Sequence, residues 1–191
     1  MTRPLEDRLE EILRAAPSLM LVLRKARELD LPDWMIFSGA IYQRVLNHLT
    51  GRDPDYGIKD YDLGYFDASD TSYEAEDVVI RRGADAFDSP FKEQVEVRNQ
   101  ARVHIWFEPK FKEAYAPLTR TGEAISRFTT VAFAVGARLR PDDSLLIEAP
   151  YGLEDLFSLT LRPNPTRATN GFARTAENVT RRWPELTVLD A

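Results

Sequence analysis

The sequence predicts a fold of the α+β or α/β class, in which helices and short strands alternate along one domain. Apolar residues recur at helical spacing in several segments, and short apolar runs of strand length separate those segments. The 191 residues fit one domain, with no linker long enough to divide it. We expect a single domain over 1–191, with N-terminal helices in 1–30, a core that carries the candidate site in 34–110, and a hairpin with helices in 120–191.

The N-terminal part predicts two helices and then a strand, a tight turn and a third helix. Leucines and isoleucines at helical spacing predict helices over 5–15 and 18–29, the second with Pro17 in its first turn. "WMIF" (34–37) is an apolar run of strand length that ends in Ser38-Gly39. The apolar face of 40–49 predicts the third helix, which the loop "TGRDPDYG" closes.

The middle of the chain predicts two strands with a helix between them. The acidic stretch "IKDYDLGYFD" predicts a strand over 59–66, and "TSYEAEDVVIRRGADAF" predicts the helix. In "QVEVRNQARVHIWF" (94–107), polar and apolar residues alternate, which predicts one long strand with Glu96, Arg98 and later polar residues on one face.

The C-terminal part predicts a hairpin among short helices. "PDD" favours a turn between the apolar runs "VAFAVGARLR" and "SLLIEAP", so we expect a β-hairpin. Short helices are predicted over 122–128 and in "GLEDLFSL", and a last helix in "GFARTAENVTRRW".

Composition restricts the classes of function. A net charge of −6 and a pI near 5.1 argue against an extended nucleic-acid-binding surface, because affinity for phosphate backbones comes mostly from clustered Lys and Arg. The absence of cysteine excludes disulfides, zinc–thiolate sites and cysteine nucleophiles. The N-terminal stretch is acidic, unlike a signal peptide, and the apolar run "SLMLVL" is far shorter than the roughly twenty residues of a membrane helix. We expect a cytoplasmic protein that does not enter the membrane.

The first candidate site is a pair of carboxylates. Asp60 and Asp62 are two residues apart on a predicted strand, so both side chains leave the same face. Carboxylates that close repel unless a cation lies between them, and their hard oxygens suit Mg²⁺. A solvated strand face would carry the same pattern, so a bare D-x-D leaves both interpretations open. Asp67 has the opposite parity and is expected to cap the turn that follows.

A turn upstream of the pair favours the first interpretation. "FSGA" leads from a strand into a helix, where free backbone N–H groups and the positive end of the helix dipole can hold a phosphate. Ser38 could add its hydroxyl. Alone, the Ser38-Gly39 turn is equally well explained by backbone conformation.

A third acid would complete a two-metal site. Glu96 in "VEV" begins a predicted strand with apolar neighbours, and Glu93 is the alternative. Three carboxylates beside a phosphate-binding turn suit in-line phosphoryl or nucleotidyl transfer, in which one ion activates a hydroxyl and the other neutralises the triphosphate.

This order of motifs resembles the DNA polymerase beta-like nucleotidyltransferase superfamily, whose pattern is a Gly-Gly or Gly-Ser turn, a D-x-D strand and a third strand acid. The resemblance extends over roughly 36–165 to a bacterial family of uncharacterised nucleotidyltransferase-like proteins, through "SGAIYQRVLNHLTG", "IKDYDLGYFD", "VRNQARVHIWF" and "APYGLEDLFSLTLRPNP". It implies a minimal nucleotidyltransferase fold, a short mixed β-sheet with flanking helices and a C-terminal β-hairpin plus helices.

The resemblance also implies roles for individual residues. Ser38 and Gly39 would form the phosphate turn, and Asp60, Asp62 and Glu96 would hold one or two Mg²⁺ ions. Two positions depart from the pattern, since Ser38 stands where glycine is common and Tyr42 where related tRNA-modifying enzymes often carry arginine.

Three polar residues of "NQARVHIWF" have open roles. If they face the acidic pair, Arg102 binds a triphosphate oxygen and His104 a substrate group. The alternatives are an ion pair of structural purpose for Arg102 and a hydrogen bond within the sheet for His104. The role of Asn99 is equally open.

The sequence thus favours an Mg²⁺-dependent transferase that moves a nucleoside monophosphate from an NTP, expected to be ATP, to an acceptor hydroxyl. The alternative is a non-catalytic module that binds a nucleotide or a protein. A purely structural protein would require Asp60 and Asp62 to be paired with Lys or Arg. The acceptor cannot be named, although the acidic composition makes nucleic acid unlikely. Arg181 and Arg182 are expected on a solvated helix face, and Trp106 in the core or at its rim.

Overall fold

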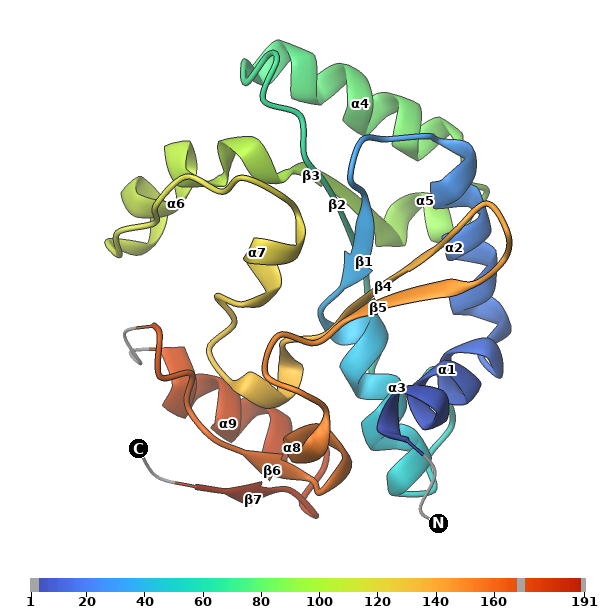
Figure 1. The fold of residues 1–191 in the computed structure, drawn as a ribbon, viewed down its shortest axis with the longest axis vertical. Coiled ribbons are helices and arrows are strands. Elements are labelled where there is room, and N and C mark those ends of the chain that lie inside the picture. Colours follow the sequence, from blue (N-terminus) through green and yellow to red (C-terminus); the bar gives the residue numbers. More distant parts are fainter. Residues whose placement is uncertain (1–3, 168–170, 190–191) are drawn as a thin grey trace.

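A five-stranded mixed sheet lies at the centre of the computed structural model, which describes residues 4–167 and 171–189 (Figure 1). The strand order is β3-β2-β1-β4-β5, and only the β2–β3 pair is parallel. The strands are β1 (Met35–Phe37), β2 (Tyr61–Tyr65), β3 (Val95–Asn99), β4 (Gly136–Leu139) and β5 (Leu145–Glu148). The expected mixed sheet with flanking helices is confirmed, and so is the hairpin, which is β4–β5.

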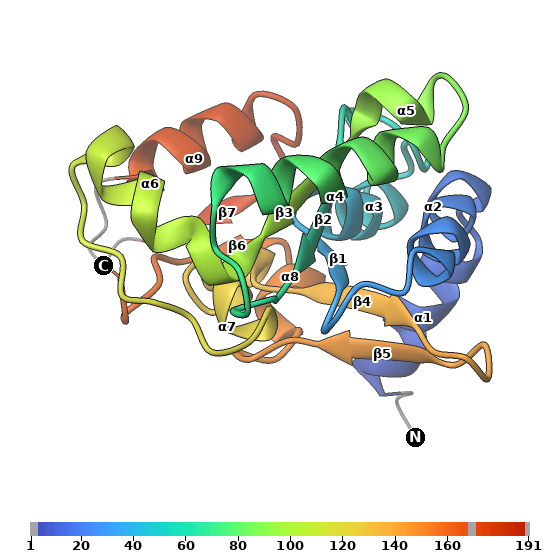
Figure 2. The same cartoon turned by 90° about the horizontal axis from the view of Figure 1, so that it is seen from above.

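The helices cover both faces of this sheet. They are α1 (Leu5–Arg14), α2 (Pro17–Glu28), α3 (Gly39–Leu49), α4 (Tyr73–Asp85), α5 (Phe91–Gln94), α6 (Val103–Phe111), α7 (Gly122–Ile125), α8 (Glu154–Phe157) and α9 (Phe172–Thr180), with 3₁₀ turns η1 (Gln100–Arg102) and η2 (Val131–Phe133). A small parallel pair, β6 (Thr160–Leu161) and β7 (Thr187–Val188), lies near α8 and α9. In both views, α1 and α2 lie on the opposite side of the molecule from α6 and α7 (Figures 1 and 2).

Alternation along β1 divides the core in two. Ile36 belongs to the large apolar cluster that α1, α2 and α3 build, whereas Met35 and Phe37 pack with Ile125 of α7 in a smaller cluster. On β2, Leu63 faces the large cluster, so Asp62 and its neighbours of the same parity face the other side. The acidic side chain therefore lies on the sheet face that is only partly covered.

The predicted strand over 94–107 is wrong beyond Asn99. The Asn99 side-chain oxygen accepts the backbone N–H of Ala101 and caps η1, after which the chain continues as α6. A short alternating apolar pattern does not distinguish a strand from a helix when a capping residue precedes it. The apolar run 131–135 forms η2 rather than an extended strand, and the predicted helix over 122–128 is limited to α7.

The other predicted helices agree with the structure in place and type, with ends that differ by a few residues, whereas the short helix α5 was not predicted. None of the helices among the described residues is both long enough and apolar enough to span a membrane.

Candidate functional site

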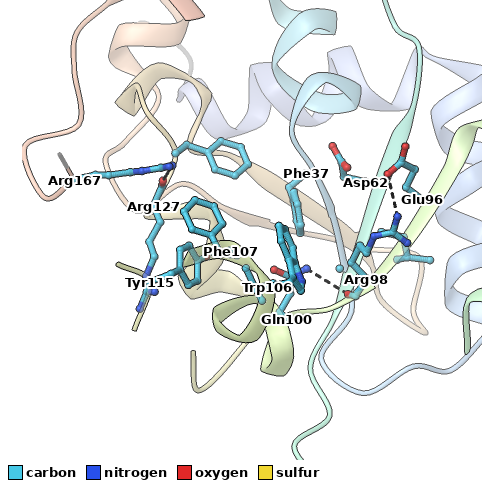
Figure 3. Close-up of a pocket in the computed structure, with 15 residues that line it drawn as sticks. Phe37, Asp62, Glu96, Arg98, Gln100, Trp106, Phe107, Tyr115, Arg127 and Arg167 are labelled. Carbon is cyan, nitrogen blue, oxygen red and sulfur yellow. Dashed lines mark hydrogen bonds and ion pairs between the residues drawn. The ribbon is translucent and has the colours of Figure 1, made fainter. Parts of the chain in front are cut away.

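Asp62 forms part of the wall of two separate depressions. One, the polar cleft, has a volume of about 570 Å³. Its lining residues are Ser38, Gly39, Tyr42, Gln43, Gly57, Lys59, Asp60, Asp62, Asn178, Arg181 and Arg182. The other, the aromatic pocket, has a volume of about 210 Å³ and contains Glu96 at the same end as Asp62 (Figure 3).

The turn between β1 and α3 adopts a backbone conformation that is rare for a residue with a side chain. Ser38 has φ 65° and ψ −146°, a region that glycine occupies at little cost. Glycine, which the resemblance implies at this position, would adopt this conformation without strain. The conformation turns the chain sharply into α3. The Ile41 N–H donates to the Ser38 carbonyl, whereas the N–H groups of Gly39 and Ala40 have no partner within the helix, and Gly39 lines the polar cleft. The predicted order of strand, turn and helix around Ser38 is therefore present, and anion binding by this turn stays a prediction.

Pairing within the sheet brings the turn and the acids together. Phe37, the residue before Ser38, is opposite Asp62 in the β1–β2 ladder, and Asp62 is opposite Glu96 in the β2–β3 ladder. Asp60 precedes β2 rather than lying on it, and its side chain is exposed. Asp62 and Glu96 therefore lie on neighbouring strands, and Asp60 lies in the segment that leads into β2.

The surroundings of Asp62 raise its pKa to about 6. Burial is the largest cause, and the negative charge of Asp60 is the second. The Ser38 hydroxyl donates a hydrogen bond that opposes the shift, Glu96 adds to it, and Arg98 opposes it. Asp62 forms no ion pair with a Lys or Arg of the described residues, and the same is true of Asp60. This lack of pairing argues against a purely structural role for the two acids.

The donor set suits a magnesium ion only in part. As the side chains lie, no three His, Asp or Glu residues of the described chain converge on one metal position. Glu96 is exposed and lies 3.7 Å from Arg98. Mg²⁺ is commonly held by one or two carboxylates together with waters and substrate phosphates. Asp60 and Asp62 fit that smaller set, in which a cation would also relieve the repulsion that raises the pKa of Asp62.

Cations face the two aspartates across the polar cleft. Lys59 comes from the segment before β2, and Arg181 and Arg182 follow α9. Arg182 donates to the Gly57 carbonyl at 3.2 Å, and Arg181 pairs with Glu177. Acids beside a helix N-terminus and opposite basic side chains can accommodate a metal–triphosphate, in which both signs of charge need partners.

A buried hydrogen-bond centre holds the C-terminal segment at this cleft. Asn47 of α3 accepts a hydrogen bond from the Trp183 indole at 3.0 Å and donates to the carbonyls of Tyr56 and Pro54 at 2.9 and 3.2 Å. It thereby fixes the loop that leads to Asp60 and the segment that carries Arg182. Asn47 and Trp183 are both fully buried.

The structure does not bring Arg102 to either depression. Its guanidinium pairs with the buried Glu76 carboxylate and donates to the Thr71 carbonyl at 3.0 Å. This contact joins η1 to α4 and is the structural alternative that the sequence left open. Arg102 therefore has no place in the nucleotide site that we propose below.

The other open residues also lie outside the cleft. The Asn99 side-chain amide donates to the Asp67 carbonyl at 2.8 Å and accepts from the Asp67 N–H at 3.1 Å. Glu93 of α5 accepts a hydrogen bond from the Ser89 hydroxyl at 2.7 Å. His104 lies on α6 beside a shallow hollow away from Asp62. Asp67 accepts two hydrogen bonds from Ser69, which confirms its predicted turn-capping role.

Sequence reasoning missed the basic side of the cleft. It assigned Arg181 and Arg182 to a solvated helix face. The next residue is Trp183, and a large apolar side chain of this kind is expected to pack in the core, which restrains the residues beside it. A helix end that leads directly into a buried Trp183 is held against the protein, so its arginines have a fixed position. Lys59 gave no signal beyond its place next to the acidic pair.

Comparison with known proteins places this fold and its chain in a family. A structure solved by NMR and described as a CCA-adding enzyme head domain matches with a TM-score of 0.75 and 26% sequence identity, covering 95% of this chain and 96% of that one. A family model described as nucleotidyltransferase matches residues 24–188. The chain therefore belongs to a nucleotidyltransferase family. No protein of curated function matches it.

Proposed function

We propose that the protein transfers a nucleoside monophosphate from an NTP to an acceptor hydroxyl and releases pyrophosphate in an Mg²⁺-dependent reaction. ATP is the proposed donor. The observation that carries this proposal is the polar cleft, where the Ser38-Gly39 turn, Asp60, Asp62 and the two arginines of the C-terminal segment face one another. Membership of a nucleotidyltransferase family supports the reaction class.

The chain's own residues would act as follows. The N–H groups after Ser38, with Arg181 and Arg182, would bind the β- and γ-phosphates and hold the α-phosphate beside Asp62. Asp60 and Asp62 would hold Mg²⁺, which when bound supplies charge stabilisation of the phosphates. Glu96 would accept the proton of the attacking hydroxyl from the far side of Asp62.

Binding and transfer are tested separately. Isothermal titration with Mg-ATP and the other Mg-NTPs is performed on the wild type and on Asp60→Ala with Asp62→Ala. The matched control is Asp67→Ala with Asp70→Ala, which removes the same charge from acids that only cap turns. We expect micromolar to millimolar binding that the first double variant loses and the control retains. No binding of any Mg-NTP by the wild type, or unchanged binding by the first double variant, would reject the proposal.

The alternative is a module that binds a nucleotide without transferring it. The exposed position of Glu96, with Arg98 beside it, is the observation that favours this alternative. NTP labelled at the α-phosphate, incubated with candidate acceptors, separates the two. Labelled product supports the transferase, whereas binding without transfer to any acceptor supports the module.

A further inference from the structure

The aromatic pocket begins at Asp62 and leads away from the polar cleft. Its walls are the rings of Phe37, Trp106, Phe107, Tyr115 and Phe128, which come from β1, α6 and the segments around α7. Figure 3 shows Asp62 and Glu96 at one end and Arg127 and Arg167 at the other, with aromatic rings between them. The pocket thus has a carboxylate end, a planar apolar middle and a basic end.

A glycine on β2 keeps the pocket open. A Cβ at Gly64 would lie 2.5 Å from the Phe37 ring and 3.1 Å from the Thr121 methyl group, so a side chain there would displace the wall. Gly64 and Asp62 are two residues apart on the same strand and share a face. The strand that carries the acid is therefore also shaped to accommodate the aromatic wall.

The two arginines at the basic end differ in their pairing. Arg167 is neutralised by Glu113, with hydrogen bonds of 2.8 and 3.1 Å, and it lowers the pKa of that carboxyl. Arg127 lies over the Tyr115 ring, 4.4 Å from its centroid, and donates a hydrogen bond to the Ala116 carbonyl. Hydrogen bonds to Glu123 are the main cause of the lowered pKa of that carboxyl, and the charge of Arg127 contributes to it. Among the described residues, however, Arg127 forms no direct ion pair with a carboxylate. Arg127 therefore offers a positive charge that an anionic ligand could meet.

Transfer chemistry places the acceptor in this pocket. In-line displacement requires the attacking oxygen and the leaving pyrophosphate on opposite sides of the α-phosphorus. If the pyrophosphate lies in the polar cleft, the attacking hydroxyl arrives from the aromatic pocket, where Glu96 lies. About 210 Å³ is below the roughly 300–1,000 Å³ of drug-sized ligand sites, so the pocket has room for one small ring.

We propose that the acceptor is a small molecule with a planar ring, an anionic group and a hydroxyl. This inference rests on the proposed function. The ring lies between the aromatic side chains, the anion meets Arg127, and the hydroxyl points to Asp62 and Glu96. Its oxygen forms the new bond to the α-phosphorus, its proton passes to Glu96, and the bond to the β-phosphate breaks, with its electron pair leaving on pyrophosphate.

The test uses three probes of similar size, titrated while the fluorescence of Trp106 is followed. The probes are 4-hydroxybenzoate (planar and anionic), 4-hydroxybenzamide (planar and neutral) and trans-4-hydroxycyclohexanecarboxylate (anionic and not planar). We expect 4-hydroxybenzoate to bind at least 10-fold more tightly than either of the others. Trp34 and Trp183 are buried outside the pocket, so a ligand in the pocket should change the fluorescence of Trp106 alone. The control is Trp106→Phe, in which the change in fluorescence on adding the probe should disappear.

One variant probes the basic end. Arg127→Gln should weaken 4-hydroxybenzoate at least 10-fold and leave 4-hydroxybenzamide unchanged, whereas Arg174→Gln, an exposed arginine of α9 outside both depressions, should change neither. The comparison of the three probes on the wild type needs no variant, so it stands even if Arg127→Gln fails to fold.

The outcomes separate this inference from the proposed function. Mg-ATP binding without binding of 4-hydroxybenzoate, or equal binding of all three probes, overturns the acceptor inference alone. Displacement of 4-hydroxybenzoate by Mg-ATP also overturns it, because the pocket would then receive the base of the NTP. Binding of 4-hydroxybenzoate without binding of any Mg-NTP rejects the proposed function and with it the acceptor role of the pocket.

Discussion

The polar cleft and the aromatic pocket share Asp62 but are built in different ways. The cleft combines a helix N-terminus, two acids and three cations, from α3, the start of β2 and the C-terminal segment. The pocket contains five aromatic rings, from β1 and from the segments between β3 and η2. The cleft suits a metal-bound triphosphate, which every NTP has, whereas the pocket suits the ring and the anionic group of one class of acceptor. A substitution on one side should therefore leave the other side intact, and only Asp62 should affect both.

The largest effect is expected at the shared residue. Asp62→Asn removes a proposed metal ligand without changing the size of the side chain, and it should lower the transfer rate on the order of 10³-fold. The measurement is the release of labelled pyrophosphate under saturating NTP. Asp67→Asn has the same charge change on a residue that caps a turn, and its rate should stay within about twofold of the wild type.

The next effect should be confined to the cleft. Arg182→Gln removes a charged hydrogen-bond donor from the proposed triphosphate site, which should weaken Mg-ATP by about 10-fold or more. Binding of 4-hydroxybenzoate in the aromatic pocket should not change. Arg174→Gln on α9 serves as the control, and a loss of both ligands with Arg182→Gln would contradict the independence of the two depressions.

The pH dependence of folding should also trace to Asp62. Its pKa of about 6 in the folded protein exceeds the ordinary value of 3.8, so folding favours the protonated form. That contribution to stability is fully present below pH 3.8 and is lost as the pH rises through 6. Asp62→Asn cannot ionise, so at pH 7.5 it should be more stable than the wild type by on the order of 1–2 kcal/mol.

Urea unfolding in EDTA, at several values between pH 4 and pH 8, checks this prediction. The difference between the two proteins is the quantity to plot, because other acids of lowered pKa, such as Glu113, alter the stability of both proteins equally. If the difference in the free energy of unfolding does not grow between pH 4 and pH 7, the pKa of Asp62 is not raised in the folded state.

The smallest effect concerns the turn. Ser38→Gly and Ser38→Ala both remove the hydroxyl, but only alanine keeps a Cβ at φ 65°. The glycine variant should therefore be more stable than the alanine variant by about 1 kcal/mol. Urea unfolding at pH 7.5 measures this difference, and a more stable alanine variant would show that the turn is not strained.

Local patterns predicted the parts of the site that lie next to one another in the sequence. The strand, the Ser38-Gly39 turn and the helix after it follow from apolar spacing, and "VEV" predicted a strand that carries Glu96. The register that sets Glu96 opposite Asp62 is known only from the structure. Two pieces failed for a physical reason. Arg102 does not lie in the site, because the capping residue Asn99 ends the strand before it. The arginines next to Trp183 are positioned by contacts with residues more than 100 positions away in the sequence, which local patterns do not reveal.

The hydrogen bond between Asn47 and Trp183 has a consequence for the order of assembly. During synthesis, the turn, the acids and the whole central sheet emerge before the residues that follow α9. Until Trp183 reaches Asn47, a nascent chain holds acids without the arginines that oppose them. Competence to bind a triphosphate would thus arise only when the segment that follows α9 docks, so that a chain made only as far as α9 would not sequester nucleotides.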